Sequence, residues 1–393
     1  MTAAALPMTD ALLGTYRRAP MEFVRGEGVR LFDAEGRAYL DFASGIAVNA
    51  LGYNDAGVRA ALQDALGSGL IHTSNLFRTE PGERLADKLV AASFADRVFF
   101  CNSGAEANEG AFKLARRWAR GVGGPAKHEI ISLRGAFHGR LFGTVAATDR
   151  PQYRNPFRPL AGGIHIHERD IDELARVITD EQTAAVIAEP IQGEGGMRVL
   201  DTGFLRELRA LTRERGVLLI LDEIQCGYGR TGTFFAYEQF DIEPDLLTVA
   251  KPMAGGLPMG AILLTQQVAD AIQPGDHGTT FGGGPLVSAV ANHVFDRLRA
   301  PELLAHVRRE GTWLGDQLTA LMARSAKVRS VRGRGLMWGV DVTDPAKDVV
   351  ARALEKGLLI VGAGDHTLRL LPPLVMSRAE LAEGLALLEA AIG

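Results

Sequence analysis

Unbroken runs of apolar residues recur along the middle of the chain, and each ends in polar or glycine-rich residues. They are "DRVFFCNSG", "EIISLRGAFHG", "AAVIAEPIQGEGG", "GVLLILDEIQ" and "DLLTVAKPMAGG". Runs of this kind are typical of parallel strands that are buried on both faces. Helical patterns such as "AEANEGAFKLARRWAR" separate them. Strands that alternate with helices predict right-handed crossovers and a mainly parallel sheet, which is an α/β fold.

The two ends of the chain have a different pattern. Residues 23–42 alternate in polarity and turn at glycines, which predicts a small antiparallel meander. Residues 56–69 and 81–93 have helical patterns, the second with Pro81 near its start. From about residue 315, a helix, a strand pair in "VRSVRGRGLMWGVDV", another helix, short strands and a last helix predict an α+β region.

Composition and charge narrow the class of protein. Hydrophobic residues make up 47% of the chain and charged residues 23%, as in soluble globular proteins. The net charge of −4 gives no electrostatic footprint for nucleic acid and no basic patch for a membrane. No apolar run reaches the roughly 18 residues of a membrane span, and "MTAAALPMTD" lacks the regions of a signal peptide. Cys101 and Cys226 are too few for a disulfide framework, so we expect a cytoplasmic protein.

Ligands of open α/β sheets bind beyond the carboxyl ends of the strands. We therefore expect the residues that follow the predicted strands to lie on one rim. They include a carboxylate, a lysine, an aromatic ring and a glycine turn at a helix start, the parts needed to hold an anionic aromatic cofactor. The set comprises Ser103, Gly104, Ala105, Phe137, His138, Arg140, Glu189, Gln192, Glu194, Asp222, Gln225 and Lys251.

Two of these strand ends carry unusual charges. The apolar run from Val217 to Leu221 leads directly into Asp222 and Glu223. An ionised carboxylate at the end of a buried strand is costly unless something cationic meets it, so we expect a cation there. Lys251 ends another apolar run, and it is either a solvated lysine or a desolvated nucleophile. This residue alone does not decide between the two interpretations.

Other candidates also have an ordinary structural interpretation. Ser103, with Glu106 three residues later, forms a capping box, which starts a helix whether or not an anion binds there. Phe137 on its own fits a core position, and His138 fits an ordinary hydrogen-bonded histidine. These residues gain a functional meaning only as a set.

Several further motifs can be set aside. The segment "HIH" at 165–167 places two histidines on one strand face, but no third ligand has suitable spacing, so we expect no metal. The glycines of "RGRGLMWG" precede a predicted strand instead of a helix, which excludes a dinucleotide fingerprint. The chain has neither a phosphate-loop motif nor a GxSxG motif.

Taken together and in order, the motifs resemble one enzyme family. The segments "NSGAEANEGAFKLAR", "FHGR", "EPIQGEGG", "LDEIQCGYGRTG", "AKPMAGGLPMGA" and "HGTTFGGGPL" are similar to those of class-III pyridoxal-phosphate aminotransferases of fold type I. The N-terminal segments most resemble the acetylornithine aminotransferase branch. Two departures are visible: "YNDA" at 53–56 replaces a His-x-His-Pro-like turn, and "AKPM" replaces the commoner "AKGL". Both leave the cofactor motifs intact.

The resemblance implies a domain organisation and an assembly. A large cofactor-binding α/β domain would span residues 56–310. A smaller α+β domain would be built from both termini, over residues 1–55 and 311–393. Thr280 would reach the phosphate of the neighbouring subunit, which implies a homodimer with shared active sites.

The resemblance also implies how pyridoxal 5'-phosphate is held. Asp222 would pair with the protonated ring nitrogen, so that the cofactor itself is the expected cation. Lys251 would form the Schiff base and then serve as the acid and base of the proton shift. Gln225 would hydrogen-bond the ring hydroxyl, and Phe137 would stack on the ring. Ser103 and the backbone of Gly104 and Ala105 would cradle the phosphate.

Four further residues are assigned to the substrates by the same resemblance. Arg140 would take the α-carboxylate of acetylornithine, and Arg369 that of 2-oxoglutarate. Glu194 would pair with Arg369 during the first half-reaction and release it in the second. Thr279 would also contact the substrate. The ordinary interpretation of Glu194 and Arg369 is a surface ion pair, but their positions within the motifs favour the exchange of partners.

The expected reaction moves the δ-amino group of N2-acetyl-L-ornithine to 2-oxoglutarate, in arginine biosynthesis. Alternative donors are succinylornithine, ornithine, 4-aminobutyrate and a carrier-linked lysine of lysine biosynthesis. A third class comprises a glutamate-1-semialdehyde mutase-like enzyme or a catalytically silent scaffold. Lys251 and Asp222 argue against a silent protein. The pair of Glu194 and Arg369 argues against a mutase, which has no need to alternate with 2-oxoglutarate.

Overall fold

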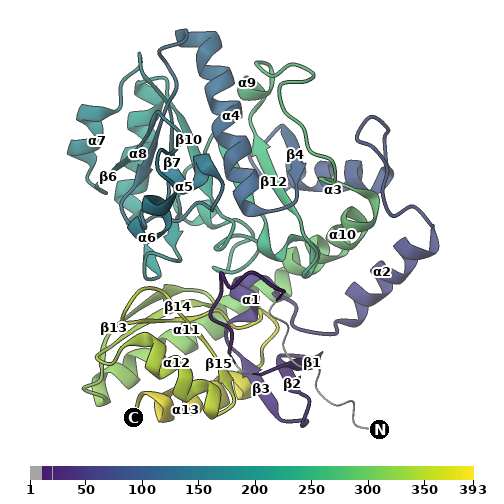
Figure 1. Ribbon diagram of the computed structural model, residues 1–393, viewed down its shortest axis with the longest axis vertical. Coiled ribbons are helices and arrows are strands. Elements are labelled where there is room, and N and C mark those ends of the chain that lie inside the picture. Colours follow the sequence, from purple (N-terminus) through teal and green to yellow (C-terminus); the bar gives the residue numbers. More distant parts are fainter. Residues whose placement is uncertain (1–10, 20) are drawn as a thin grey trace.

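The computed structural model describes residues 11–19 and 21–393; the segment 1–10, in which we expect no signal peptide, lies outside the described residues. A seven-stranded sheet forms the centre of the larger part of the molecule, with the strand order β4-β12-β11-β10-β7-β5-β6 (Figure 1). Its strands are β4 (Arg97–Cys101), β5 (Glu129–Leu133), β6 (Ile164–His167), β7 (Thr183–Ala188), β10 (Leu218–Asp222), β11 (Leu246–Val249) and β12 (Gly260–Leu264).

The sheet is mainly parallel, which confirms the prediction from the apolar runs. Its one antiparallel member is β12, which pairs in opposite direction with both β11 and β4. The sequence interpretation did not include β12, because the apolar run "GAILL" follows directly on a glycine-rich turn and no helix precedes it. A short return from β11 can form only an antiparallel pair, since a parallel pair needs a long crossover.

Helices cover both faces of this sheet, because alternate strand residues point to opposite sides. On β10, Ile220 packs in one hydrophobic cluster with Leu114 of α4, and Leu221 packs in the other with Leu208 of α8. The helices of this part are α2 (Ala56–Gly67), α3 (Glu80–Ala91), α4 (Gly104–Gly123), α5 (Phe142–Ala146), α6 (Pro151–Arg154), α7 (Ile171–Val177), α8 (Thr202–Glu214), α9 (Gln266–Ala269) and α10 (Pro285–Arg299).

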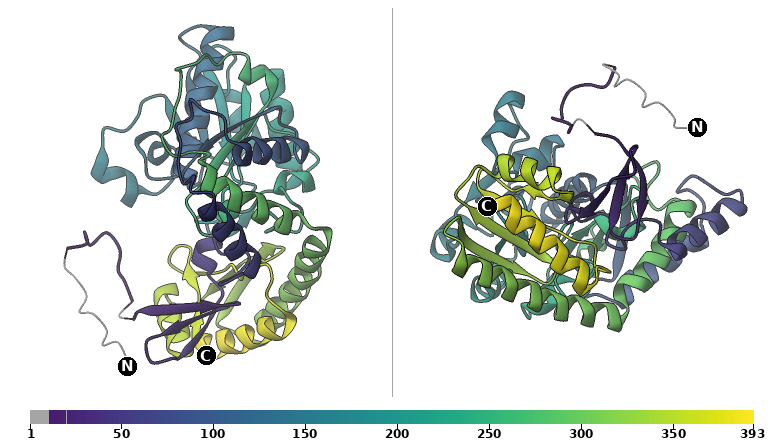
Figure 2. Two further views of the ribbon diagram at one scale, coloured as in Figure 1. Left: turned by 90° about the vertical axis from the view of Figure 1, so that its right-hand side faces the viewer. Right: turned by 90° about the horizontal axis from the view of Figure 1, so that it is seen from below.

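The second part of the molecule combines both ends of the chain (Figure 2). The predicted N-terminal meander forms as β1 (Phe23–Glu27), β2 (Arg30–Asp33) and β3 (Ala38–Asp41), and β15 (Leu358–Leu359) joins β3 in parallel. A four-stranded sheet contains β13 (Val328–Arg334), β14 (Met337–Val342), β17 (Thr367–Leu370) and β16 (Val361–Gly362). The helices of this part are α1 (Ser44–Ala47), α11 (Pro301–Arg324), α12 (Ala346–Glu355) and α13 (Arg378–Ile392). Elsewhere in the chain, β8 (Ile191–Gln192) and β9 (Arg198–Val199) form a separate small antiparallel sheet. The domain boundaries at 55 and 310 remain a prediction.

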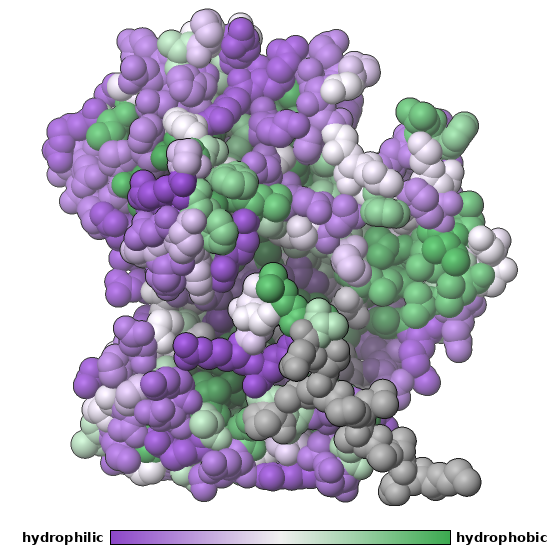
Figure 3. Space-filling view, in the orientation of Figure 1, coloured by the Kyte–Doolittle hydropathy of each residue, from purple (hydrophilic) through white to green (hydrophobic). Residues whose placement is uncertain are grey.

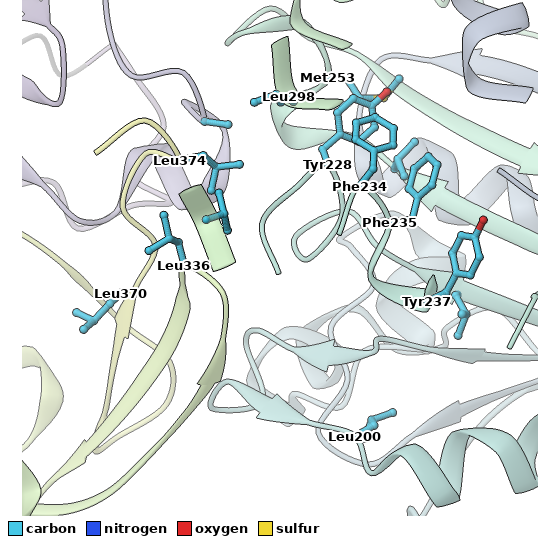
Figure 4. Close-up of a cluster of buried hydrophobic side chains, with 14 of the residues drawn as sticks. Leu200, Tyr228, Phe234, Phe235, Tyr237, Met253, Leu298, Leu336, Leu370 and Leu374 are labelled. Atoms are coloured by element: carbon cyan, nitrogen blue, oxygen red, sulfur yellow. The ribbon is translucent and has the colours of Figure 1, made fainter. Parts of the chain in front are cut away.

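One hydrophobic cluster connects the two parts. Tyr228 and Phe234, from the segment after β10, lie with ring centroids 4.9 Å apart. The same cluster includes Leu336, Leu370 and Leu374 of the C-terminal part (Figure 4). Shared burial of this kind fixes the segments after β10 and on β17 relative to each other, and these segments carry candidate site residues.

The departure at residues 53–56 has a local structural role. Asp55 is the N-cap of α2, and its carboxylate accepts hydrogen bonds from the backbone N–H groups of Gly57 and Val58. Tyr53 donates its hydroxyl hydrogen to Asp41 at 2.6 Å. The segment "YNDA" is therefore a helix start anchored to β3.

None of the helices in the described part of the chain combines the length and apolarity that a membrane crossing requires.

Candidate active site

A cavity of about 390 Å³ lies at the carboxyl edge of the large sheet. The strand order brings the ends of β4, β5, β10 and β11 to this edge, which is where ligands of α/β sheets bind. Eleven of the twelve residues predicted to lie on one rim line it, all except Gln192: Ser103, Gly104, Ala105, Phe137, His138, Arg140, Glu189, Glu194, Asp222, Gln225 and Lys251. Arg369 lies behind this lining and contacts two of its members, whereas Thr279 and Thr280 line a different hollow.

Asp222 is buried and firmly oriented. Its Oδ2 atom accepts a hydrogen bond from Asn108 Nδ2 at 2.7 Å and lies 2.8 Å from His138 Nδ1, while Oδ1 accepts the backbone N–H of Ile224. Thr248 in turn donates to Asn108 Oδ1 at 2.7 Å. Among the described residues no lysine or arginine forms an ion pair with Asp222. The carboxylate therefore faces the cavity without a permanent cation of the protein beside it.

The sequence interpretation missed Asn108 and treated His138 as an ordinary hydrogen-bonded histidine. Both are fully buried and hold Asp222. The signal for Asn108 was present in the sequence, since it is an amide on the face of α4 that otherwise carries Ala107 and Ala111. A polar side chain among buried alanines requires a hydrogen-bond partner.

Glu223, the second carboxylate at the end of β10, forms hydrogen bonds with backbone N–H groups and has no cation beside it among the described residues. Its two oxygens accept the N–H groups of Ala236 and Tyr237 at 2.6 and 2.7 Å. Burial raises the pKa of Glu223 to about 8, and these hydrogen bonds act in the opposite direction. Glu223 thus anchors the segment after β10, and only Asp222 needs a cation from the cavity.

Lys251 begins the short helical turn that follows β11, and its ammonium group is enclosed by the cavity. Burial and, second to it, the positive charge of Arg369 lower the pKa of Lys251 to about 8, while Glu194 and Asp222 act in the opposite direction. A lysine with this pKa has a much larger neutral fraction near physiological pH than an ordinary lysine has. This environment favours the interpretation of Lys251 as a nucleophile over that of a solvated lysine.

The N-terminus of α4 provides an anion site at the same cavity. Ser103 Oγ caps the helix by accepting the N–H of Glu106, and the Glu106 carboxylate accepts the N–H of Asn102. The first N–H groups, on Gly104 and Ala105, have no carbonyl one turn before them and are free to bind an anion. A Cβ atom on Gly104 would lie 2.7 Å from the Ile224 side chain, so any other residue here would displace Ile224 or the start of α4.

Apolar and aromatic side chains form the walls of the cavity. Phe137 and Ile224 both line it, which provides surfaces for a flat ring. Phe137 also contacts Tyr153 edge to face, with centroids 6.3 Å apart. The guanidinium of Arg140 lies 3.3 Å from the centroid of the same tyrosine ring. Tyr153, which the sequence interpretation did not identify, therefore positions both Phe137 and Arg140.

Arg369 and Glu194 form the predicted pair. Arg369 Nη1 donates to Glu194 Oε1 at 2.5 Å and to Gln225 Oε1 at 3.4 Å. Arg369 is only 2% exposed, and its Nε atom has no partner among the described residues. The pair is not a surface ion pair, because its arginine is buried behind the cavity that contains Lys251.

Together these groups match an anionic aromatic cofactor that carries an aldehyde. The free helix N-terminus suits a phosphate, the buried carboxylate suits a protonated ring nitrogen, and the lysine amine suits the aldehyde.

The two histidines of the segment "HIH" lie next to carboxylates. His165 lies 3.5 Å from Glu129, and His167 lies 3.0 Å from Glu173.

Comparison with known proteins agrees with this site. Residues 14–392 match the family "Aminotransferase class-III". Acetylornithine aminotransferase of Xanthomonas campestris pv. campestris is 46% identical, over 100% of this chain and 98% of the relative. Succinylornithine transaminase of Yersinia pseudotuberculosis is also 46% identical, over 95% and 93%. The crystal structure of N-acetylornithine aminotransferase from Stenotrophomonas maltophilia K279a superposes with a TM-score of 0.84 at 41% identity, over 96% of each chain. The chain belongs to the class-III aminotransferases, and it is a pyridoxal-phosphate-dependent enzyme of fold type I.

Proposed function

We propose that the enzyme transfers the δ-amino group of N2-acetyl-L-ornithine to 2-oxoglutarate, giving N-acetyl-L-glutamate 5-semialdehyde and L-glutamate. This reaction belongs to arginine biosynthesis, and we place it in the cytoplasm. The observation that carries the proposal is the pair formed by the buried Arg369 and Glu194 near Lys251. Such a pair is needed where one cavity must accept an ω-amine in one half-reaction and a dicarboxylate in the other.

The contacts of the cofactor-binding residues support the roles that we propose for them. Bound pyridoxal phosphate supplies an electron sink for the carbanion that forms at the substrate carbon. Asp222, oriented by Asn108 and His138, would keep the ring nitrogen protonated. The N-terminus of α4 and Ser103 would hold the phosphate, and Phe137 and Gln225, which also line the cavity, would contact the ring and its hydroxyl group.

Lys251 holds the cofactor and carries the proton. Its lowered pKa leaves part of the amine neutral, so that it can attack the aldehyde. With the substrate amine bound, the same Nζ atom would accept the proton from the amine-bearing carbon of the substrate and would pass it to the cofactor. A single residue thus serves as nucleophile, base and acid.

The two arginines divide the carboxylates between them. Arg140, held over Tyr153, binds the α-carboxylate of the amine donor at the mouth of the cavity. Arg369 binds the α-carboxylate of 2-oxoglutarate when Glu194 swings away. Glu194 has a quarter of its side chain exposed, which gives it room to move, whereas Arg369 is fixed in β17. Thr279 contributes to the substrate site of the assembled enzyme.

We also propose a homodimer that completes each site. Thr280 is exposed, and Thr279 accepts a hydrogen bond from Asn102, which lines the cavity. Large apolar side chains are exposed nearby, and the face that carries α2 shows a wide apolar area (Figure 3). They are Leu66, Leu70, Ile71, Leu76, Phe77 and Phe281. An apolar area of this kind on a globular protein favours a second copy as its partner.

The substrate assignment is tested by one series of assays. Purified enzyme is assayed with 2-oxoglutarate and with acetylornithine, succinylornithine, ornithine or 4-aminobutyrate as donor, and kcat/KM is compared. We expect the highest value for acetylornithine. A higher value for succinylornithine would assign the enzyme to that donor, which the equally similar Yersinia relative makes the second candidate. A highest value for ornithine or 4-aminobutyrate would contradict the proposal.

The proposed homodimer is tested separately. Light scattering on the purified enzyme should give the mass of a dimer.

A further inference from the structure

A second cavity, of about 360 Å³, lies along α4 and away from the catalytic cavity. Its polar lining is almost entirely basic: Lys113, Arg116, Arg117, Arg120 and Lys127, with His128 and His277, against the single carboxylate of Asp276. Without the histidines, this lining has a charge of +4, from five cations and one anion, in a chain whose net charge is −4. Lys113 is nine residues after the start of α4, which places the two sites roughly 13 Å apart along the helix.

The basic residues on α4 occupy one face of the helix, where their like charges repel one another. Residues 113, 116, 117 and 120 are spaced three and four apart, so that like charges lie next to each other. Like charges at these spacings repel and destabilise a helix. The negative end of the helix dipole accounts for Arg120 in the last turn, but it does not account for Arg117 and Lys113, which lie about one and two turns earlier.

The cations are held in place by the fold. Arg116 donates to the backbone carbonyls of His128 and Gly162, both at 2.8 Å. Lys127 is 3% exposed, and its ammonium donates to the carbonyl of Asp180 at 2.6 Å. Backbone carbonyls orient these groups without cancelling their charge, so the positive potential belongs to the cavity itself.

The remaining donors are available to a ligand. Arg120 has no hydrogen-bond or ion-pair partner among the described residues. Arg117 contacts Asp276 at 2.9 Å through Nε, which leaves its outer nitrogens free. Lys113 lies 2.9 Å from His277 Nδ1.

Four further carboxylates lie near the basic residues of this cavity. They are Glu106 beside His277, Glu109 beside Arg116, and Asp180 and Glu181 beside Lys127.

We infer that this basic cavity is a binding site for an oligophosphate, either inorganic pyrophosphate or the phosphate tail of a nucleotide. Guanidinium groups bind phosphate oxygens in pairs, and several fixed cations favour a ligand with several charges in a small volume. The volume lies within the usual range of small-ligand sites. The ligand is absent from the catalytic reaction, so this site adds a second binding function to the enzyme.

Binding is measured by calorimetry on the enzyme loaded with pyridoxal phosphate, which occupies the catalytic phosphate site. The probes are pyrophosphate, ATP, adenosine and citrate, at low salt. We expect saturable binding of pyrophosphate and ATP that weakens as salt is added, and none of adenosine. Binding of adenosine and ATP without pyrophosphate would overturn the inference in favour of a nucleoside site. Binding of citrate alone would overturn it in favour of a carboxylate site, and absence of all binding would also overturn it.

Two variants locate the site. Arg120→Gln removes a charge that no contact of the fold requires, and it should weaken pyrophosphate binding about 10-fold. Arg213→Gln is the matched control, because Arg213 is an exposed arginine in the last turn of another helix, α8. It should leave binding unchanged. Equal affinity of the two variants would place the ligand elsewhere and refute the inference. Both should keep wild-type aminotransferase activity, so that a failure here is distinct from a failure of the proposed reaction.

Discussion

Asp222 Oδ2 lies 2.8 Å from His138 Nδ1 and accepts a hydrogen bond from Asn108 Nδ2, so one carboxylate oxygen is held by two buried side chains. These contacts come from the loop after β5 and from α4, two elements that approach β10 from different directions. They fix the carboxylate at the end of an apolar strand. The charge of Asp222 is thereby directed at the cavity and cannot relax away from it.

Asp222→Asn should fold normally and still bind the cofactor, because the amide has the same shape. It should turn over about 10²–10³ times more slowly, since a neutral amide cannot keep the ring nitrogen protonated. The measurement is kcat at saturating cofactor, with the thermal melting temperature as the control for folding. Turnover close to that of the wild type would show that another group protonates the ring.

Lys251→Ala should lose nearly all activity, because the nucleophile and the proton carrier are lost together. In the wild-type enzyme, borohydride reduction should attach the cofactor permanently to Lys251. Peptide mapping by mass spectrometry identifies the labelled lysine. The assignment fails if the label is on another lysine, such as the buried Lys127.

Cofactor uptake should depend on pH through Lys251. Burial and the charge of Arg369 lower its pKa to about 8, so the amine is protonated and unreactive below that pH. The rate at which cofactor-free enzyme takes up pyridoxal phosphate should therefore rise up to about pH 8 and then level off. Arg369→Ala removes one cause of the lowered pKa and should move the curve to higher pH. A rate that still rises beyond pH 10 would mean an ordinary, solvated lysine.

Gly104→Ala should weaken cofactor binding. The added Cβ would lie 2.7 Å from Ile224, so either the side chain or the start of α4 must shift where the phosphate binds. A cost of about 1–2 kcal/mol corresponds to roughly a 5- to 30-fold rise in Kd, measured by fluorescence titration. Gly121→Ala on the same helix is the control, because nothing lies within 4 Å of its Cβ. Equal affinities in the two variants would show that the close approach at Gly104 is unimportant.

The sequence predicted most of the large sheet because strands buried on both faces leave unbroken apolar runs. Lys251 and Asp222 could be found for the same reason, since they interrupt such runs at strand ends that converge in this fold. Asn108 and Tyr153 were missed. They act by holding Asp222 and Arg140, and a contact between segments far apart in the chain leaves no local pattern. Thr279 and Thr280 line a different hollow of the chain, and the roles proposed for them require a second subunit.

The central claim is that Glu194 and Arg369 alternate, so that one cavity accepts an ω-amine and then a dicarboxylate. It is tested most directly by stopped-flow measurement of each half-reaction in Arg369→Ala, with Arg140→Ala as the comparison. Loss of a charge-assisted contact costs about 2–3 kcal/mol, or roughly 30- to 150-fold in rate. We predict a loss of this size in the 2-oxoglutarate half-reaction of Arg369→Ala and little change in its acetylornithine half-reaction. Arg140→Ala should lose rate in both halves, because the second carboxylate of 2-oxoglutarate would occupy the place of the donor's carboxylate at Arg140. Equal losses in the two half-reactions of Arg369→Ala would contradict the account and leave the pair as a structural one.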